Sequence, residues 1–361
     1  MTRQILIISN PDDIHAYAVS EALYAKEVPH LLLDTTLFPS KATYSIHCSS
    51  SEPEIHLYEK LTETSTKLSP NTIWWRRPKL AELPDWLHEN DIAFAALECD
   101  KFLSNLWQAL DSTDSFWVNP YWPSIYADQK FNQQHLARKV GLKTPETLYS
   151  NNPEEIRKFI LKHDNRTIYK PFSPKHASWV KNDKPYALYT SAISLKDLPS
   201  EAILQITPGI FQPLIEKAYE LRVTFIGNHC ISAKLHSQET QKGTVDWRAA
   251  YDELKVSITT IPQVLKNACA LLMKELNIVF GCFDFIVTPA GEYIFLEVNE
   301  SGQFLWIERY TKAPILDIFT NFLMASNIDF APIGISPKVS YSMIREKAAA
   351  RMKAAAQHRK D

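Results

Sequence analysis

Residues 283–306, FDFIVTPAGEYIFLEVNESGQFLW, constrain the fold of this chain more than any other segment. Apolar side chains alternate on either side of a Pro-Ala-Gly turn, a pattern that predicts two β-strands joined as a hairpin. The alternating residues are Phe283, Phe285 and Val287 before the turn and Ile294, Leu296 and Val298 after it. The other face carries two carboxylates and one carboxamide, contributed by Asp284, Glu297 and Asn299. Burying an ionised Asp284 between two phenylalanines would be costly without a partner, so this face needs a counter-charge.

The three polar residues supply the oxygen ligands that Mg²⁺ prefers. Protein-bound Mg²⁺ commonly keeps several waters and bridges the phosphates of a substrate. We therefore predict that Asp284, Glu297 and Asn299 bind Mg²⁺ together with a nucleotide phosphate.

A second hairpin is predicted at residues 220–237, ELRVTFIGNHCISAKLHS, with Gly227 and Asn228 at its turn. Alternation assigns one face to Leu221, Val223 and Phe225, with Ile231, Ala233 and Leu235 opposite them. The other face then carries Glu220, Arg222, Thr224, Ser232, Lys234 and His236. A sheet with one solvated polar face is the ordinary explanation for such a pattern when the hairpin is considered alone.

Taken together, the two hairpins predict a nucleotide site on the polar face. The cations available to neutralise phosphates are Arg222, Lys170 and Lys130. Residues 203–217 form a strand and a connector, which can contact adenine through the backbone at Gln212 and Leu214. Glu220 lies just beyond this connector and can accept hydrogen bonds from ribose hydroxyls. Lys130, on a predicted helix, would otherwise be an ordinary solvated lysine.

The start of the chain predicts a parallel α/β domain. Its β-α-β unit consists of a strand at 4–9, a helix at 14–26 and a strand at 29–36. The unit contains no G-x-G-x-x-G motif, so the dinucleotide fingerprint is absent. The segment NTIWWRRP, residues 71–78, is a further buried strand that ends in Arg76 and Arg77. These arginines either cap the strand end or bind substrate. A long helix is predicted at residues 91–111.

An aromatic and proline-rich segment at residues 116–130 marks a domain boundary. The elements predicted after it are a helix at 128–141, a strand at 143–150, a helix at 152–163 capped by Asn152, and a strand at 167–172. The domains we expect are 1–120, 121–205 and 206–335, followed by a basic, alanine-rich tail at 336–361. No apolar stripe is evident in the tail, so we expect a solvated helix or a frayed end.

Composition excludes several functional classes. The 361 residues carry a formal net charge of −2, which gives no reason to expect nonspecific nucleic-acid binding or a polybasic membrane patch. No apolar run reaches membrane-spanning length. The first residues, MTRQILIISNPDD, predict a buried strand rather than a signal peptide. The five cysteines have no metal-binding spacing, so we expect reduced thiols in a cytoplasmic protein.

The order of these motifs resembles the ATP-grasp superfamily over about residues 120–325. The stretches that carry the resemblance are DQKFNQQHLARKVGLKTPET with Lys130, TIYKPF with Lys170, FQPLIEKAYELRVTFIGN with Glu220 and Arg222, and GCFDFIVTPAGEYIFLEVNESGQF with Asp284, Glu297 and Asn299. Within the superfamily the chain looks most like the microviridin-type graspetide macrocyclases, which cyclise ribosomally made peptides. That narrower match rests on WWRRP at 74–78, LHSQETQKGTVDWR at 235–248 and GQFLWIERYTKAPI at 302–315.

The resemblance implies a mixed α/β (α+β) ATP-grasp fold with a pre-ATP-grasp N-terminal domain, a central lid domain and a C-terminal ATP-binding domain. It implies ATP and Mg²⁺ as cofactors, and a precursor peptide with a leader and an acidic core as partner. It also allows a homodimer. Arg222 and Arg248 are the expected catalytic residues, holding an acyl phosphate or the incoming carboxylate. Asp246, with Arg76 and Arg77, is expected to contact the peptide, although a surface salt bridge would also explain Asp246 and Arg248.

One departure from many ATP-grasp enzymes concerns the loop after Lys170, PFSPKHASWVKNDKPYALYT, which contains no glycine. Glycine lets backbone N–H groups approach phosphates closely. Lys175, His176 and Ser178 could bind phosphate through side chains instead. Two alternatives therefore stay open: a ligase that joins amino acids or small molecules to a peptide or protein tail, and a nucleotide-binding scaffold without turnover.

Overall fold

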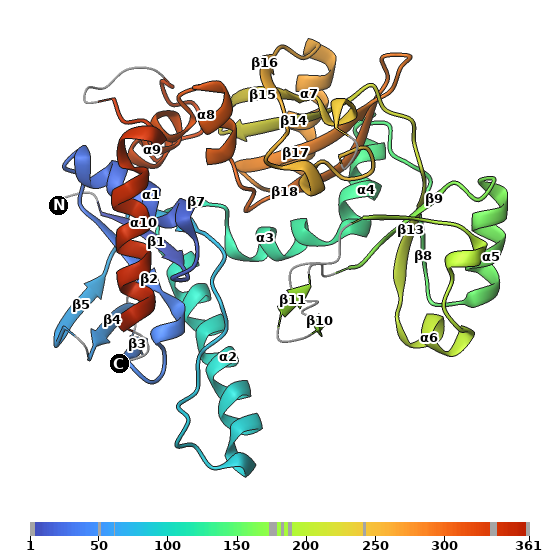
Figure 1. Cartoon of the computed structure of the whole chain (residues 1–361). Helices are drawn as coiled ribbons and strands as arrows, with labels where there is room; N and C mark the ends of the chain where they lie inside the picture. The colour runs from blue at the N-terminus through green and yellow to red at the C-terminus, as the bar shows by residue number, and fades with distance from the viewer. Residues whose placement is uncertain are drawn as a thin grey trace.

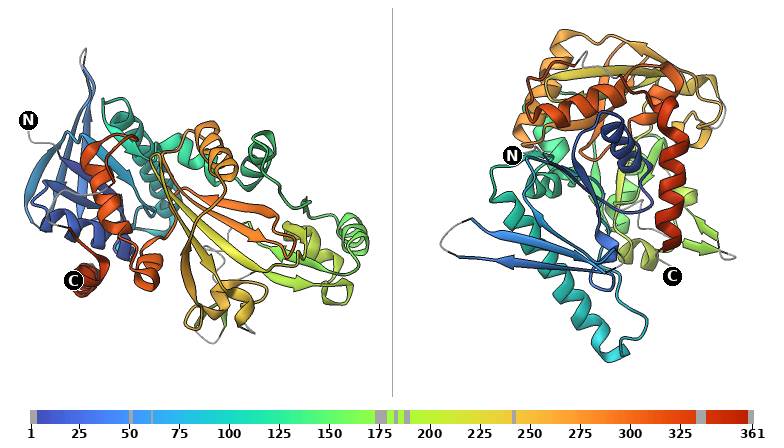
Figure 2. Two further views of the ribbon diagram at one scale, coloured as in Figure 1. Left: turned by 90° about the horizontal axis from the view of Figure 1, so that it is seen from above. Right: turned by 90° about the vertical axis from the view of Figure 1, so that its left-hand side faces the viewer.

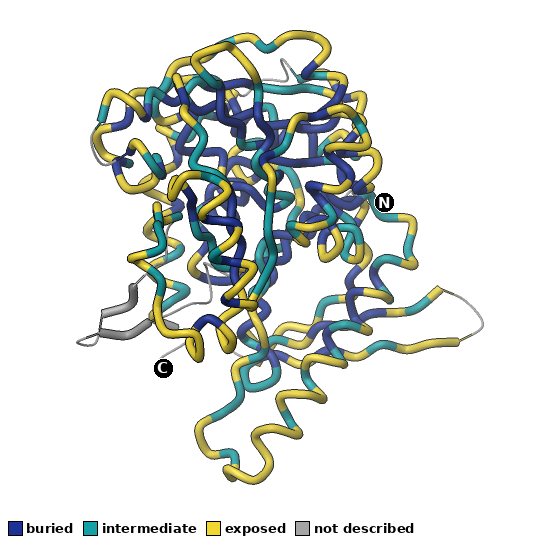
Figure 3. The backbone as a smooth tube through the Cα atoms, turned by 90° about the vertical axis from the view of Figure 1, so that its right-hand side faces the viewer, coloured by how far each residue is buried: buried dark blue, intermediate teal, exposed yellow. Residues whose placement is uncertain are grey.

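The computed structural model describes residues 4–49, 52–60, 62–172, 179–181, 184–186, 190–240, 243–332 and 338–358. These residues form an N-terminal, a central and a C-terminal region, and the C-terminal region lies between the other two (Figures 1 and 2). Each of the three regions has buried residues in its sheet (Figure 3). The first half of the long helix at residues 89–111 in the N-terminal region is mostly exposed. No helix within the described ranges is both long and apolar enough to cross a lipid bilayer.

The N-terminal region contains a parallel sheet in the order β2-β1-β6-β7, which confirms the predicted β-α-β opening. Its elements are β1 (Ile5–Ser9), α1 (Ile14–Ala25), β2 (His30–Asp34), β6 (Thr72–Trp75) and β7 (Phe116–Val118). The chain inserts an antiparallel sheet and two helices, namely η1 (Thr35–Leu37), β3 (Ala42–His47), β4 (Glu54–Glu59), β5 (Thr64–Leu68) and α2 (Glu89–Asp111). The side chain of Asp13 caps α1 by accepting from the N–H groups of His15 and Ala16.

The central region is built on a four-stranded sheet in the order β12-β9-β13-β8. Its strands are β8 (Leu148–Ser150), β9 (Thr167–Lys170), β12 (Ser191–Ile193) and β13 (Gly209–Pro213), with a separate hairpin of β10 (Trp179–Lys181) and β11 (Lys184–Tyr186). The chain segment of this region contains the helices α3 (Tyr121–Asp128), α4 (Lys130–Lys139), α5 (Pro153–Lys162), η2 (Leu195–Asp197) and α6 (Glu201–Ile206). Of these, α3 and α4 pack against the C-terminal sheet. Asn152 caps α5 as predicted, since its side chain accepts from two N–H groups of the first turn. The sheet includes β13, so it continues beyond the expected domain boundary at residue 205.

The C-terminal region is an antiparallel sheet in the order β16-β15-β14-β17-β18 with helices on both faces. Its strands are β14 (Tyr219–Ile226), β15 (His229–Leu235), β16 (Val256–Thr259), β17 (Phe280–Val287) and β18 (Tyr293–Asn299). Its helices are η3 (Ser237–Glu239), η4 (Trp247–Ala250), α7 (Gln263–Glu275), α8 (Leu305–Thr311), α9 (Ile315–Ala325) and α10 (Tyr341–His358). One buried cluster joins this region to the N-terminal sheet, because Trp74 packs edge-on against Phe319 of α9.

The pairing of β14 with β15 corrects the predicted faces of that hairpin. Ile226 pairs with His229 across a two-residue turn, so odd-numbered residues of β14 oppose even-numbered residues of β15. Arg222 therefore faces Ala233, and Leu221 faces Lys234. The predicted grouping of Leu221, Val223 and Phe225 with Ile231, Ala233 and Leu235 is wrong, and the face with Arg222 is largely buried rather than solvated.

An irregularity in the other hairpin changes its expected alternation. The register between β17 and β18 shifts between Asp284 and Phe285, as in a β-bulge. Phe285 consequently opposes Phe295, and the two rings lie 5.7 Å apart in the core. The prediction that Leu296 continues the apolar alternation is wrong, because Leu296 is the extra residue at the shift. Beyond the shift, Asp284 directly opposes Glu297.

The C-terminal tail is not a solvated helix. α10 packs along α1, and the side chains of Ile344 and Ala348 are buried in the core shared with α1 (Figure 2). Arg351 of α10 also forms an ion pair with Glu21 of α1 at 2.6 Å. The apolar stripe consists of residues one helical turn apart, and alanine supplies half of it. It was missed because alanine is a weak apolar signal.

Candidate active site

The three predicted metal ligands lie together at one end of the β17–β18 pair. Asp284 and Glu297 are direct cross-strand partners, and Asn299 follows two residues later on the same face. The Nδ2 group of Asn299 donates to Asp284 Oδ2 at 3.2 Å and to Glu297 Oε1 at 3.1 Å. Two carboxylates and one amide oxygen are therefore available in one small volume.

Two predicted phosphate-binding cations contact these carboxylates. Arg222 is the cross-strand partner of Asp284, and its Nη1 lies 2.6 Å from Asp284 Oδ2. Lys130, the first residue of α4, places its Nζ 2.8 Å from Glu297 Oε2. Each carboxylate thus has a cation of its own, on the opposite sides of the pair.

The environment shifts the pKa values of the two carboxyl groups in opposite directions. Burial raises the pKa of Asp284 above its ordinary value, and the nearby charge of Glu297 adds to this, although Arg222 opposes both. Burial would also raise the pKa of Glu297, but Lys130 and Arg248 outweigh it and hold that pKa well below its usual range. Such like-charged neighbours in a buried site favour a divalent cation between them.

The donor set fits Mg²⁺. No group of three or more His, Cys, Asp or Glu side chains suited to a metal occurs among the residues that the structure describes. Two carboxylates and an amide are nevertheless enough for Mg²⁺, which takes one or two protein carboxylates and completes its octahedron with water and phosphate oxygens. The site is therefore suited to metal held jointly with a nucleotide.

A second group of cations faces the carboxylates from other elements. Lys170 ends β9 of the central sheet, and burial together with the nearby Arg248 lowers its pKa, although Glu297 opposes this. No residue in the described ranges forms an ion pair with its ammonium group. Arg248 lies on η4, where its Nε is 3.0 Å from Asp246 Oδ1. Burial destabilises the charged form of the Lys170 ammonium group, and donating to phosphate oxygens would stabilise that form.

The predicted nucleoside residues lie on β13, the connector and β14. Gln212 donates through Nε2 to Thr147 Oγ1 at 3.0 Å, and Leu214 donates its N–H to the carbonyl of Arg166 at 2.8 Å. The backbone N–H of Leu214 is therefore engaged within the protein. Glu220 is buried, and burial raises its pKa.

Lys217 is a site residue that the sequence reasoning missed. Its Nζ lies 2.6 Å from Glu220 Oε1 and donates to the carbonyl of Val245 at 3.0 Å. Both residues are buried, and Lys217 partly offsets the effect of burial on the pKa of Glu220. The sequence contains a signal for this pair, because Lys217 lies three residues before Glu220, within IEKAYE, directly after the connector.

Arg76 and Arg77 meet the chain just after Asn299. Arg76 is wholly buried, and its Nη1 donates to the carbonyls of Ser301 and Gly302. The Nε of Arg77 donates to the same Ser301 carbonyl at 3.1 Å, and burial, with the neighbouring Arg76, lowers the pKa of Arg77 to about 10. Contact with substrate stays a prediction for both, and burial disfavours it for Arg76. Lys175, His176 and Ser178 lie outside the described residues.

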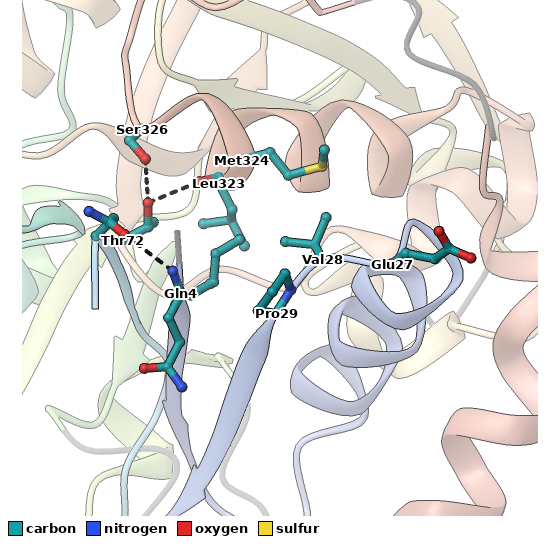
Figure 4. A pocket seen from close by; sticks show the side chains of 10 residues that line it. Gln4, Glu27, Val28, Pro29, Thr72, Leu323, Met324 and Ser326 are labelled. Atoms are coloured by element: carbon teal, nitrogen blue, oxygen red, sulfur yellow. Dashed lines mark hydrogen bonds between the residues drawn. The ribbon is translucent and has the colours of Figure 1, made fainter. Parts of the chain in front are cut away.

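A cavity of about 250 Å³ lies elsewhere, between the beginnings of β1 and β6 and the end of α9 (Figure 4). Its lining residues are Gln4, Ile5, Glu27, Val28, Pro29, Asn71, Thr72, Leu323, Met324 and Ser326. Half of them are apolar, and none is a predicted site residue. Thr72 Oγ1 donates to the carbonyl of Leu323 at 3.0 Å and lies 2.6 Å from Ser326 Oγ. The cavity therefore lies at the interface between the N-terminal sheet and α9.

Comparison with known proteins identifies the fold. Residues 4–124 match the family model of the MvdD pre-ATP grasp domain. No curated protein matches the chain. The RiPP-associated ATP-grasp ligase of Chryseobacterium gregarium, solved in complex with ADP and a leader and core peptide, shares 25% identity and a TM-score of 0.79, over 90% of this chain and 97% of that one.

Two further solved structures are similar. Macrocyclase MdnC from Microcystis aeruginosa MRC, bound with precursor peptide MdnA, is 26% identical with a TM-score of 0.77, over 89% of this chain and 99% of that one. The ATP-grasp ligase PsnB, complexed with a minimal precursor, Mg and ADP, is 22% identical with a TM-score of 0.68, over 89% and 97% of the two chains. PsnB supports the fold alone.

The chain therefore has an ATP-grasp fold with a pre-ATP-grasp N-terminal domain, which confirms the predicted fold class. More particularly, it begins with an MvdD-type pre-ATP-grasp domain and is similar throughout to RiPP-associated ATP-grasp ligases and macrocyclases.

Proposed function

We propose that this chain is an ATP-dependent ligase that activates a side-chain carboxylate of a ribosomally made precursor peptide and closes an ester or amide crosslink. The observation that carries the proposal is the convergence of Asp284, Glu297 and Asn299 with the cations Lys130 and Arg222. A peptide substrate is supported by the C. gregarium ligase and MdnC, which are bound to precursor peptides.

Each part of the site has a proposed role in binding ATP. Asp284, Glu297 and Asn299 would hold Mg²⁺, which supplies positive charge beside the phosphates when it is bound. PsnB, which shares the fold, is complexed with Mg and ADP. Lys130 and Lys170 contact the phosphates from the central region. The nucleoside residues are Gln212, Leu214 and Glu220, with Lys217 orienting Glu220.

The reaction consists of two transfers. A peptide carboxylate oxygen attacks the γ-phosphorus of ATP, the bond to the bridging oxygen breaks, and ADP leaves with that electron pair. A hydroxyl of Ser or Thr, or an amine of Lys, then attacks the acyl phosphate at carbon. The bond from carbon to the phosphate oxygen breaks, phosphate leaves with that electron pair, and the proton of the nucleophile passes to the phosphate or to water. Arg222 and Arg248 hold the phosphoryl oxygens during both transfers, so catalysis is mainly positioning and electrostatics.

The peptide approaches from the side of η4 and the N-terminal region in this proposal. Asp246 is almost fully buried, and its Oδ1 accepts from the backbone N–H and the Nε of Arg248. It therefore sets the direction of Arg248. Asp246 and Arg77 are the two residues proposed to contact the peptide.

Mass spectrometry tests the function directly. Precursor peptides encoded near the gene are incubated with the protein, ATP and Mg²⁺, and each ring closed is expected to remove the mass of one water. Omission of ATP or addition of a chelator is expected to stop the reaction. Product formed only with free amino acids would favour the amino-acid ligase instead. ATP turnover without any dehydrated peptide would contradict ring closure.

Lys170→Ala is expected to weaken binding of ADP and of a nonhydrolysable ATP analogue. Loss of a charge-assisted hydrogen bond costs roughly 1.5–3 kcal/mol, which is roughly ten- to hundredfold in affinity. Isothermal calorimetry measures the change, and Lys162→Ala is the control, since Lys162 is an exposed lysine of the same region paired with Glu146. Unchanged affinity in Lys170→Ala would remove Lys170 from the phosphate site.

A further inference from the structure

The residues directly after Asn299 form a loop that the N-terminal region contacts along most of its length. We name residues 300–305 the 300–305 loop, which includes the first residue of α8. Asn119, just after β7, donates through Nδ2 to the carbonyl of Glu300 at 2.9 Å. Arg76 and Arg77 donate to the carbonyls of Ser301 and Gly302, as described above. With two further contacts from His15, six polar contacts to this loop come from a region that supplies none of the proposed metal ligands.

Arg76 is the central contact. Its guanidinium is fully buried, and its Nε lies 2.9 Å from Asp13 Oδ2 while Nη1 reaches two successive loop carbonyls. A planar fork can bind a carboxylate and carbonyls at fixed angles, whereas an ammonium group cannot reproduce that geometry. Asp13 also caps α1, so the arginine connects the loop to a fixed helix end.

His15 binds the other end of the loop. Its Nε2 accepts from the N–H groups of Phe304 at 3.0 Å and Leu305 at 3.2 Å, and the Phe304 ring packs edge-on at 5.0 Å. Two donors at Nε2 require that this nitrogen carries no proton. Burial, with the nearby Arg76, lowers the pKa of His15 well below its usual value, which is consistent with an acceptor role.

The loop touches the site at two points. It begins one residue after Asn299, and the carbonyl of Gln303 accepts from Nη2 of Arg222 at 3.1 Å. A side chain at Gly302 would collide with Cys282 of β17, so the loop lies directly against the strand that carries Asp284. Any displacement of the loop would therefore move Asn299 and Arg222 relative to Asp284. Mg²⁺ tolerates little change in ligand geometry.

We propose that Arg76 and His15 are positioning residues, through which the N-terminal domain fixes the 300–305 loop and thereby the geometry of Mg²⁺–nucleotide binding at Asn299 and Arg222. This inference rests on the proposed metal–nucleotide site. It gives the pre-ATP-grasp domain a role in metal binding, although it contributes no ligand.

The test measures how strongly Mg²⁺ tightens ADP binding, given by the ratio of the ADP dissociation constants without and with Mg²⁺. Calorimetry provides the ratio without requiring turnover. Replacing residues that orient metal ligands typically costs about 10–100-fold in metal affinity. We expect His15→Leu and Arg76→Lys to lower the ratio by about tenfold or more. His15→Gln keeps an acceptor atom for the two amides and is expected to retain most of the ratio.

Lys79→Met is the matched control, because Lys79 also binds a carboxylate of the N-terminal region, Asp12, but on the surface. It is expected to leave the ratio unchanged. A lower Tm with a full ratio in both His15→Leu and Arg76→Lys would show a structural role only and overturn the inference. If His15→Leu does not fold, a full ratio in folded Arg76→Lys alone overturns it. If the wild type binds ADP tightly but shows no effect of Mg²⁺, the metal site itself fails, and the inference with it.

Discussion

Glu297→Gln and Asn299→Ala are each expected to abolish ADP formation while the protein remains folded. Each change removes one proposed metal ligand, and Glu297→Gln also leaves Lys130 without its carboxylate at 2.8 Å. Metal stabilisation of transition-state charge is worth several kcal/mol, which corresponds to at least about a hundredfold in rate. ADP release measured with a coupled assay, alongside thermal unfolding, shows the effect.

Glu292→Gln is the control for these two variants. Glu292 lies in the turn of the same hairpin and pairs with Lys143 on the surface, so its loss tests only the removal of a carboxylate from the hairpin. Surface ion pairs contribute little to stability. We expect wild-type ADP release from Glu292→Gln. The metal assignment would not survive wild-type ADP release from Glu297→Gln as well.

Asp284, Glu297 and Asn299 could be grouped from the sequence because each is the polar residue of an alternating strand. The turn at residues 289–291 alone would oppose Asp284 to Leu296, and the extra residue at the β-bulge brings Glu297 to that position. The structure keeps Asp284 and Glu297 as direct partners. The β-bulge beside them could not be predicted, because the apolar pattern is compatible with either Phe295 or Leu296 facing the core.

The faces of the β14–β15 hairpin show a limit of a different kind. The turn at Gly227 and Asn228 was predicted, yet the predicted facing pairs ignored that a two-residue turn opposes odd and even positions. Applying that rule would have placed Arg222 opposite Ala233 from the sequence alone. The two-residue turn therefore contains the information that is needed to assign the faces of this hairpin.

Contacts between distant parts of the chain were beyond the reach of pattern analysis. His15 and Arg76 meet residues more than two hundred positions away, and nothing in their own neighbourhood indicates those partners. Two arginines at the end of a buried strand are visible in the sequence, but the partners of Arg76 are backbone carbonyls, which every sequence offers. Only the packing of the N-terminal sheet against the C-terminal sheet selects which carbonyls these are.

Arg222→Lys is the second large effect that we expect, and it separates ATP binding from ligation. In the structure Arg222 uses two nitrogens, Nη1 toward Asp284 and Nη2 toward the carbonyl of Gln303. Burial disfavours its charge, but Asp284 outweighs burial and raises the pKa of Arg222. A lysine would keep the charge and lose the fork. We expect ATP affinity to stay within a few-fold of the wild type, while most peptide dehydration is lost.

The reason is that charge moves during the reaction. The resting ATP complex needs only a positive charge near the γ-phosphate, whereas the transferring group needs donors at fixed directions, and interactions that strengthen in the transition state determine the rate. ATP affinity and mass-resolved product yield are measured on one preparation, with Arg157→Lys as a surface control, since Arg157 pairs with the exposed Glu201. Product at the normal rate would reduce Arg222 to a structural partner of Asp284. If instead the wild type turns over no ATP with any carboxylate-bearing precursor, the retained ligands and cations describe a nucleotide-binding scaffold, and the ligase proposal falls before Arg222 is reached.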